Sequence, residues 1–158
     1  MAKKKSGNTG LILSVVVLLL GVAAFCMAFL VGVKYVTSKG TTLSEFTGFQ
    51  VMFGYSKEVV LAEVKVLEFS ILATLAFALP LIGAVVSLVN NKIAKLVAAL
   101  VMIAGAVLMF LLPSFVVFAA SGAGDLVSSA SALGIGAIIG GICAGLGGLV
   151  AGYAALTK

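Results

Sequence analysis

Four long stretches without a charged side chain most constrain what this chain can form. They cover residues 11–33, 69–89, 96–120 and 133–156. A helix needs about 20 apolar residues to cross a hydrocarbon core of about 30 Å, so each stretch is long enough to span a membrane. The sequence therefore predicts an all-α membrane protein, a bundle of four transmembrane helices that forms one integral membrane domain over residues 1–158.

The composition supports the same class of protein. Hydrophobic residues make up 63% of the chain and charged residues 9%. A soluble domain has about 25% charged residues, so this chain has too few charges to cover a water-exposed globule of its size.

The first apolar stretch follows a basic N-terminus, an arrangement that also begins secretory signal peptides. Lys3, Lys4 and Lys5 precede it. The apolar run is longer than the roughly 7–15 residues of a signal peptide, and no A-x-A cleavage site follows it. We therefore expect an uncleaved membrane anchor.

Lysine placement predicts the orientation of the chain in the membrane. With four spans, one side holds both termini and the short turn at residues 90–95, and this side has no acidic residue. Its basic residues are Lys3, Lys4, Lys5, Lys92, Lys95 and Lys158. Because Lys-rich short loops stay in the cytoplasm, we expect both termini to be cytoplasmic in a cell membrane. The positive charge then faces lipid headgroups, and no nucleic acid partner is expected.

Residues 37–68, between the first two stretches, are predicted to form a partly structured outer segment. Thr42 and Glu45 have the spacing of a capping box that begins a helical turn. Aromatic residues then recur at helical spacing, and such rings partition into the membrane interface. This pattern fits either an aromatic belt that closes the outer end of the bundle or a docking surface for a partner. The candidate interface residues are Phe46, Phe49, Met52, Phe53 and Tyr55.

Residues 57–68 allow two interpretations. A helix would place charged residues on one face and Val residues on the other, and Ser56 would be its N-cap. The alternation of Val64 and Val66 with charged neighbours also fits a short strand. We favour the helix, continuous with the second span.

The fourth stretch carries small residues at every fourth position, and two further glycines widen this surface. In lipid, small residues let helix backbones approach closely. The sequence predicts a helix-packing face, used either within one chain or between subunits. Its residues are Gly136, Gly140, Gly141, Ala144, Gly145, Gly148 and Gly152.

The side-chain inventory argues against catalysis. The chain has no His, and all ten basic residues are Lys, so imidazole catalysis, His ligands to a metal and Arg clamps are excluded. Cys26 and Cys143 are each alone in an apolar stretch, and Pro80 and Pro113 are expected to kink their helices. We predict no catalytic residue, no cofactor and no metal site.

The predicted function is that of a non-enzymatic structural or interaction protein in the membrane. It would self-associate as a homo-oligomer or accompany other membrane proteins in a larger complex. The alternative is a small oligomeric pore or transporter. A pore needs a wettable stripe along its helices, and the spans offer only scattered hydroxyl groups.

Residues 47–54, with the sequence TGFQVMFG, carry one resemblance. Together with the basic N-terminus and the four-span pattern, they resemble a group of small four-span membrane proteins from low-GC Gram-positive bacteria and their wall-less relatives. The likeness covers this stretch and the topology. It implies a bacterial cell membrane as the setting, and it implies no activity and no site.

Overall fold

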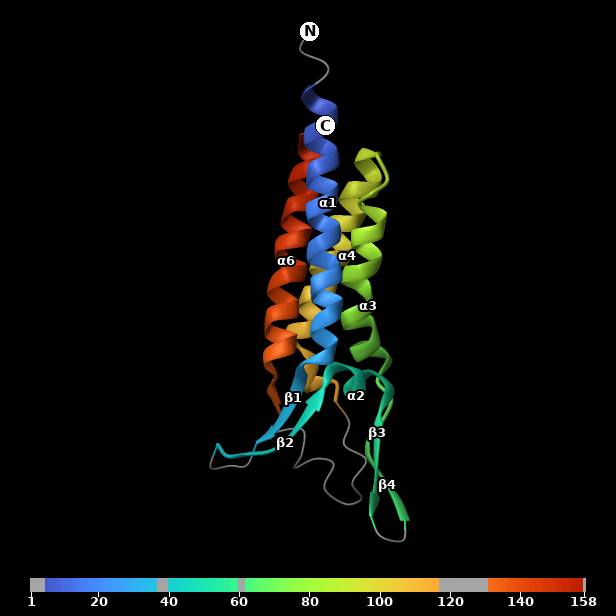
Figure 1. Ribbon diagram of the computed structural model, residues 1–158, viewed down its shortest axis with the longest axis vertical. Helices are drawn as coiled ribbons and strands as arrows, with labels where there is room; N and C mark the ends of the chain where they lie inside the picture. Colours follow the sequence, from blue (N-terminus) through green and yellow to red (C-terminus); the bar gives the residue numbers. More distant parts are fainter. Residues whose placement is uncertain (1–4, 37–39, 60–61, 117–130, 158) are drawn as a thin grey trace.

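The computed structural model describes residues 5–36, 40–59, 62–116 and 131–157. Its main elements are the helices α1 (Lys5–Cys26), α3 (Ile71–Val86), α4 (Lys92–Phe110) and α6 (Ile135–Leu156). They run along the long axis of the molecule, with the strands gathered at one end (Figure 1). Helices α1 and α4 each contact both α3 and α6, so every helix has two main neighbours.

Within the described residues, three segments are long and apolar enough to cross a membrane: Asn8–Phe29, Lys92–Phe110 and Ile135–Leu156. They correspond to the first, third and fourth predicted spans. The second predicted span contains α3, which has 16 residues and is therefore about 24 Å long. Ser70 limits α3 at its start, because its side chain accepts a hydrogen bond from the Ala73 N–H at 3.3 Å.

Two predicted spans extended too far towards the strands. Helix α1 ends at Cys26 and is followed by the turn η2 (Met27–Phe29) and the strand β1 (Val31–Val36). Helix α4 ends at Phe110, so Pro113 lies in the turn η3 (Leu112–Ser114) and does not kink a helix. Pro80 does lie inside α3. The last part of the predicted third span, residues 117–120, lies outside the described residues.

The prediction of an all-α fold holds in part: the structure is mostly helical, but strands follow α1 and precede α6. A three-stranded sheet has the order β2 (Thr42–Thr47), β1, β5 (Ser131–Leu133), and both pairs are antiparallel. Lys34 and Glu45 are paired across β1 and β2, and their charged groups lie 2.8 Å apart. The apolar residues at the end of the first predicted span thus belong to a central strand.

The helix predicted over residues 57–68 is a β-hairpin instead. Strands β3 (Tyr55–Val59) and β4 (Ala62–Leu67) pair antiparallel, with Tyr55 opposite Leu67. Ser56 is a strand residue and caps no helix. The residues of this segment fit both the helical period and the strand period, and pairing with a neighbouring strand decides between them.

A capping box is present, but five residues after the predicted one. Thr42 and Glu45 lie in β2, and Thr47 is the N-cap of the short helix α2 (Gly48–Phe53). The Gln50 N–H donates to the Thr47 hydroxyl at 3.3 Å, and the Thr47 N–H donates to the Gln50 side chain at 3.0 Å. Both sites match the motif, and pairing of β2 with β1 determines which one begins a helix.

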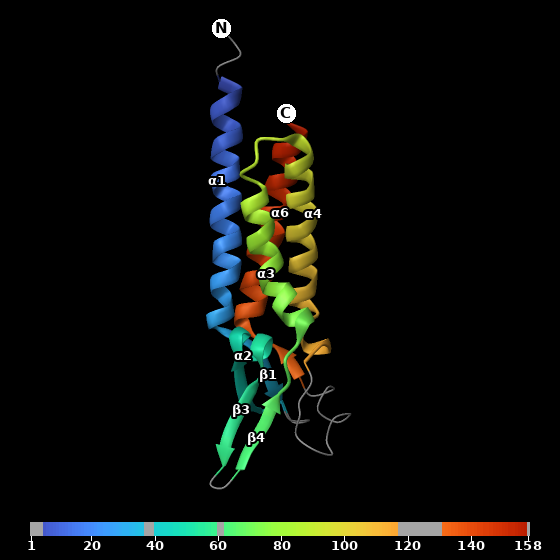
Figure 2. The ribbon, with the colours of Figure 1, turned by 90° about the vertical axis from the view of Figure 1, so that its right-hand side faces the viewer.

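Figure 2 shows that α1 begins and α6 ends at the same end of the molecule, opposite the strands and α2. Small side chains occupy much of the space between the helices, and Ala24, Ala73, Ala76, Ala137 and Ala144 are fully buried. The helices therefore pack at short range along the whole interior.

Replacing Thr47 with Ala should lower the free energy of unfolding by about 1 kcal/mol, because the Gln50 N–H loses its acceptor. Thermal unfolding in mild detergent, followed by circular dichroism, measures this change. Thr42→Ala is the matched control, since Thr42 is an exposed strand residue that caps nothing. Equal losses in the two variants would contradict the assignment of the cap.

Candidate functional site

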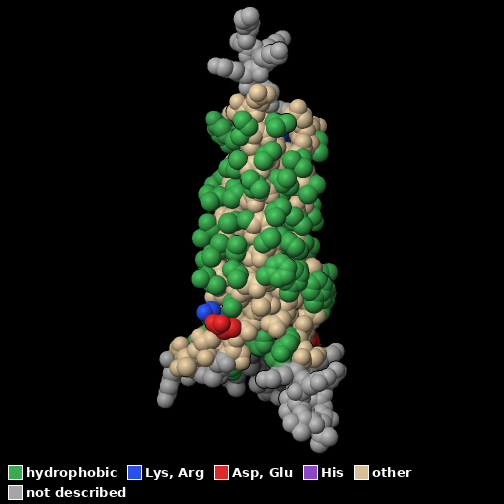
Figure 3. All heavy atoms as spheres, viewed as in Figure 1, with side chains coloured by type: hydrophobic (Ala, Val, Ile, Leu, Met, Phe, Trp, Pro, Cys, Tyr) green, Lys and Arg blue, Asp and Glu red, His purple; other side chains and the backbone are tan. Residues whose placement is uncertain are grey.

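The outward faces of the helices carry large apolar side chains. Leu19 in α1, Leu100 in α4 and Leu149 in α6 are each about two-thirds exposed. Figure 3 shows hydrophobic side chains over the length of the helices, while the acidic side chains visible in that view lie near the strands. Large apolar residues outside and small ones inside suit a surface that contacts lipid chains.

The predicted packing face of α6 lies against α1 and α4 of the same chain. A Cβ on Gly136 would lie 2.6 Å from the carbonyl oxygen of Met27, and one on Gly140 would lie 3.3 Å from that of Ala24. Ala144, one turn further along, is fully buried. At these positions the close contact is internal to the chain.

The remaining glycines of this face differ in how tightly they are packed. A Cβ on Gly148 would lie 2.7 Å from Ile103, and one on Gly141 would lie 3.0 Å from the Phe110 ring. Gly145 and Gly152 have ordinary van der Waals room, with their nearest neighbours at 4.0 and 3.8 Å. Gly147 was not predicted, yet it is buried against Met102, because the packing face is wider than a strict four-residue repeat.

The five predicted interface residues do not form one surface. Phe46 and Met52 are buried in the core. Tyr55 is partly buried, and its ring centroid lies 6.2 Å from that of Phe46. Phe46 and Met52 therefore belong to the core, and Tyr55 packs against it.

Phe49 and Phe53 instead join aromatic residues from the end of the first span. The Phe49 ring lies 4.6 Å from Phe29, 6.1 Å from Phe25 and 6.1 Å from Phe53, measured between centroids. Phe29 and Phe53 are 67% and 62% exposed. We call these four residues the outer aromatic cluster. Sequence reasoning missed Phe25 and Phe29 because they lie in an apolar stretch, where an aromatic residue cannot be told apart from other lipid-facing residues.

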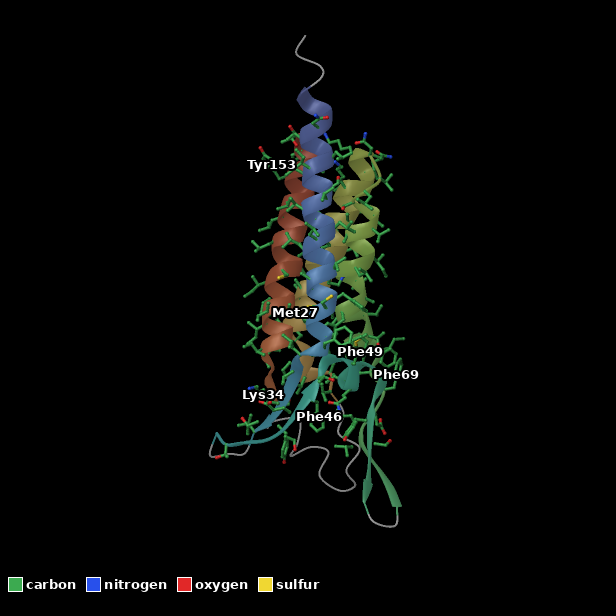
Figure 4. All side chains as sticks on the ribbon, in the orientation of Figure 1. Met27, Lys34, Phe46, Phe49, Phe69 and Tyr153 are labelled. Atoms are coloured by element: carbon green, nitrogen blue, oxygen red, sulfur yellow. The ribbon has the colours of Figure 1, made fainter. Side chains whose placement is uncertain are left out.

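Phe69 extends this aromatic surface. It lines a cavity of about 320 Å³ together with Phe53, Gly54, Leu67 and Glu68. Figure 4 shows Phe49 and Phe69 at the level where the helices give way to the strands. This level corresponds to the membrane interface if the helices span the bilayer, and exposed rings are favoured there.

A second cavity, of about 240 Å³, lies between β2, α2 and the β3–β4 hairpin. Its polar groups already serve the fold, because Glu45 pairs with Lys34 and Gln50 caps α2. The residues that line it are Ser44, Glu45, Phe46, Gln50, Tyr55 and Val66.

Lys95 was predicted to lie in the short turn at residues 90–95 between the second and third spans, and this is wrong. It lies one turn inside α4, its side chain is 1% exposed, and its Nζ donates to the Gly10 carbonyl at 3.3 Å. A signal was present in the sequence, since Lys95 shares the helical face of Ala98, Ala99 and Met102, all of which are buried.

The described residues contain no group of three or more His, Cys, Asp or Glu side chains that could hold a metal ion. Cys26 and Cys143 are free thiols, the first exposed and the second partly buried. Among these described residues, the surfaces that remain for binding are the apolar helix faces, the outer aromatic cluster and the exposed lysine Lys92.

No protein-family model, curated protein or solved structure was found to match this chain. The resemblance to small four-span membrane proteins therefore stays a prediction.

Gly136→Ala and Gly148→Ala should each lower stability by about 1–3 kcal/mol, because the added methyl meets the Met27 carbonyl or the Ile103 side chain. Gly145→Ala is the matched control in the same helix, where the methyl has room and Ala improves helix propensity by about 1 kcal/mol. Unfolding midpoints in mild detergent should fall for the first two variants and hold or rise for the third. The same response at all three sites would argue against this packing.

Proposed function

We propose that this chain is a non-enzymatic integral membrane protein that acts through association, either with copies of itself or with a larger membrane complex. The observation that carries the proposal is the outer aromatic cluster. It combines rings of α1, η2 and α2, and two of them, Phe29 and Phe53, are mostly exposed. It lies beside a folded module of strands at the end of an apolar helical body.

We further propose that all four helices cross the membrane of a bacterial cell and that both termini are cytoplasmic. Support for the fourth crossing comes from the position of α3, which packs against both α1 and α4. Exposed apolar residues flank it, Phe69 before and Leu88 after, and they extend its apolar length. Support for the orientation comes from Lys92 and Lys95, which lie at the end where α1 begins and α6 ends.

Association through the helices has less support than association through the outer end. Gly136, Gly140 and Gly148 already contact neighbouring elements of their own chain. Phe29 and Phe53 contact Phe49 within the chain but keep most of their surface exposed. Aromatic residues that become buried commonly dominate protein interfaces.

A pore within one chain has little support in the described residues. The buried polar side chains there are Ser14, Ser87 and Lys95, which all lie towards the end of the molecule with the chain termini. The middle of the interior is filled by Ala, Met and Phe side chains. A pore would have to form between copies of the chain.

Cysteine labelling tests the topology. In a variant with Cys26→Ala and Cys143→Ala, a Cys at exposed Thr42 should react with an impermeant maleimide in intact cells. A Cys at exposed Thr157 should react only after the cells are permeabilised. Labelling of both sites in intact cells would contradict an even number of spans, and labelling of Thr157→Cys alone would reverse the orientation.

Association is tested by Phe29→Ser combined with Phe53→Ser. Since both rings are exposed, the double variant should fold with an unchanged circular dichroism spectrum. Loss of interface anchors worth roughly 2 kcal/mol each should reduce its mass in mild detergent to that of one chain and remove co-purifying proteins. Light scattering measures the mass.

Leu111→Ser is the matched control, because Leu111 is partly exposed at the outer end of α4 and lies outside the cluster. It should keep the wild-type mass. A double variant that keeps both its mass and its partners would show that the aromatic rings only hold the outer segment in the membrane interface. That result would remove the support for association.

A further inference from the structure

A cavity of about 270 Å³ lies at the end of the molecule where the chain begins and ends. It is formed by the first half of α1 and the turn between α3 and α4, which approach each other in Figure 2. Three of its residues are apolar and two carry polar side chains. The residues that line it are Gly10, Leu11, Ser14, Val15, Leu88 and Asn90.

The wall of this cavity is tied to a buried cation. The Gly10 carbonyl, which lines the cavity, accepts a hydrogen bond from Lys95 Nζ at 3.3 Å and one from the Ser14 hydroxyl at 3.0 Å. Lys95 Nζ is therefore one hydrogen bond away from a residue of the cavity wall. A positive charge at this position, in apolar surroundings, is screened less than a charge in water and therefore acts over a longer distance.

The charged side chains that the structure describes near the cavity are basic. Lys92 is exposed at the start of α4, close to the same turn. Among the side chains that the structure describes, the acidic groups are Glu45 in β2 and Glu68 after β4, and both lie at the opposite end. An anion would be attracted to this end of the molecule.

The lining suits a ligand that has both an anionic and an apolar part. Leu11 is 68% exposed, and Val15 and Leu88 are about half exposed, so the apolar wall continues into the outward faces of the helices. The exposed Asn90 side chain can donate hydrogen bonds to a phosphate oxygen. A water occupies about 30 Å³, so the cavity has room for about nine waters, enough for a phosphate with a small alcohol attached.

We propose that this cavity binds the phosphate headgroup of an anionic phospholipid from the cytoplasmic leaflet, with the acyl chains lying along Leu11, Val15 and Leu88. The inference rests on the proposed function, because it requires the helices to span the membrane with this end in the cytoplasm. Basic pockets between helices on the cytoplasmic side recognise such headgroups by charge and hydrogen bonding. The lipid would bridge α1 and the α3–α4 turn.

The full chain, purified in mild detergent, provides the test. Native mass spectrometry should show phosphatidylglycerol retained in preference to phosphatidylcholine, and phosphatidylglycerol should raise the unfolding midpoint more. Asn90→Asp places a negative charge in the cavity at an exposed position that leaves folding intact. It should weaken phosphatidylglycerol binding roughly fivefold, the factor that corresponds to about 1 kcal/mol per charge near a membrane surface.

Lys95→Met should also remove most of the preference for phosphatidylglycerol over phosphatidylcholine. Lys95 is buried, so if Lys95→Met does not fold, Asn90→Asp still tests the site. Lys34→Met, at the opposite end, is the control and should bind as the wild type does. Equal retention of the two lipids would overturn the inference, and so would equal losses in Asn90→Asp and Lys34→Met. If glycerol 1-phosphate binds as tightly as phosphatidylglycerol, the ligand is a soluble phosphate ester and the lipid site is overturned.

Extraction of membranes with alkaline carbonate separates this inference from the proposed function. A chain that stays in the membrane pellet but shows no lipid preference overturns the lipid site alone. A chain released into the supernatant overturns both.

Discussion

Close contact between backbones at glycine residues positions the sheet and α2 against the helices. Where helices meet strands, a Cβ on Gly32 would lie 3.0 Å from the Gly48 Cα. Two hydrogen bonds cross this junction, from the Gly48 N–H to the Leu30 carbonyl at 3.0 Å and from the Gly134 N–H to the Gly32 carbonyl at 2.8 Å. Helix contact in hydrocarbon gains nothing from the release of water, so close packing and backbone bonds supply the attraction. The sheet, α2 and the start of α6 take their places from these contacts.

The helices could be predicted from the sequence, and the strands could not. An uncharged stretch of about 20 residues is a local property, and it located three segments long enough to span a membrane. Strand β1, in contrast, pairs with β5, which follows almost a hundred residues later. The Val residues of β1 are equally compatible with the end of a transmembrane helix. The hairpin of β3 and β4 fits two periods, and only its pairing decides between them.

The candidate sites divide in the same way. The small residues of α6 were visible as a repeat, and Gly136, Gly140 and Gly148 do lie at close contacts. The aromatic segment was visible by composition, but a strand places Phe46 inside and a helix places Phe53 outside, so spacing alone gave the wrong grouping. Lys95 was assigned to a turn because a charge was taken as the end of a span. Its contact with Gly10 joins residues far apart in the sequence.

The helices differ in length from one side of the molecule to the other. Helices α1 and α6 have 22 residues each, about 33 Å, whereas α3 has 16, about 24 Å. If α3 crosses the membrane as proposed, a bilayer would become thinner beside it wherever the flanking apolar residues do not make up its length, at a cost of a fraction of a kcal/mol for each ångström of mismatch. Neighbouring proteins with short spans reduce the cost of thinning the bilayer when they lie beside α3. Under that proposal, the side of the protein that carries α3 would favour short-spanning neighbours, and the whole chain would favour thin membranes over thick ones.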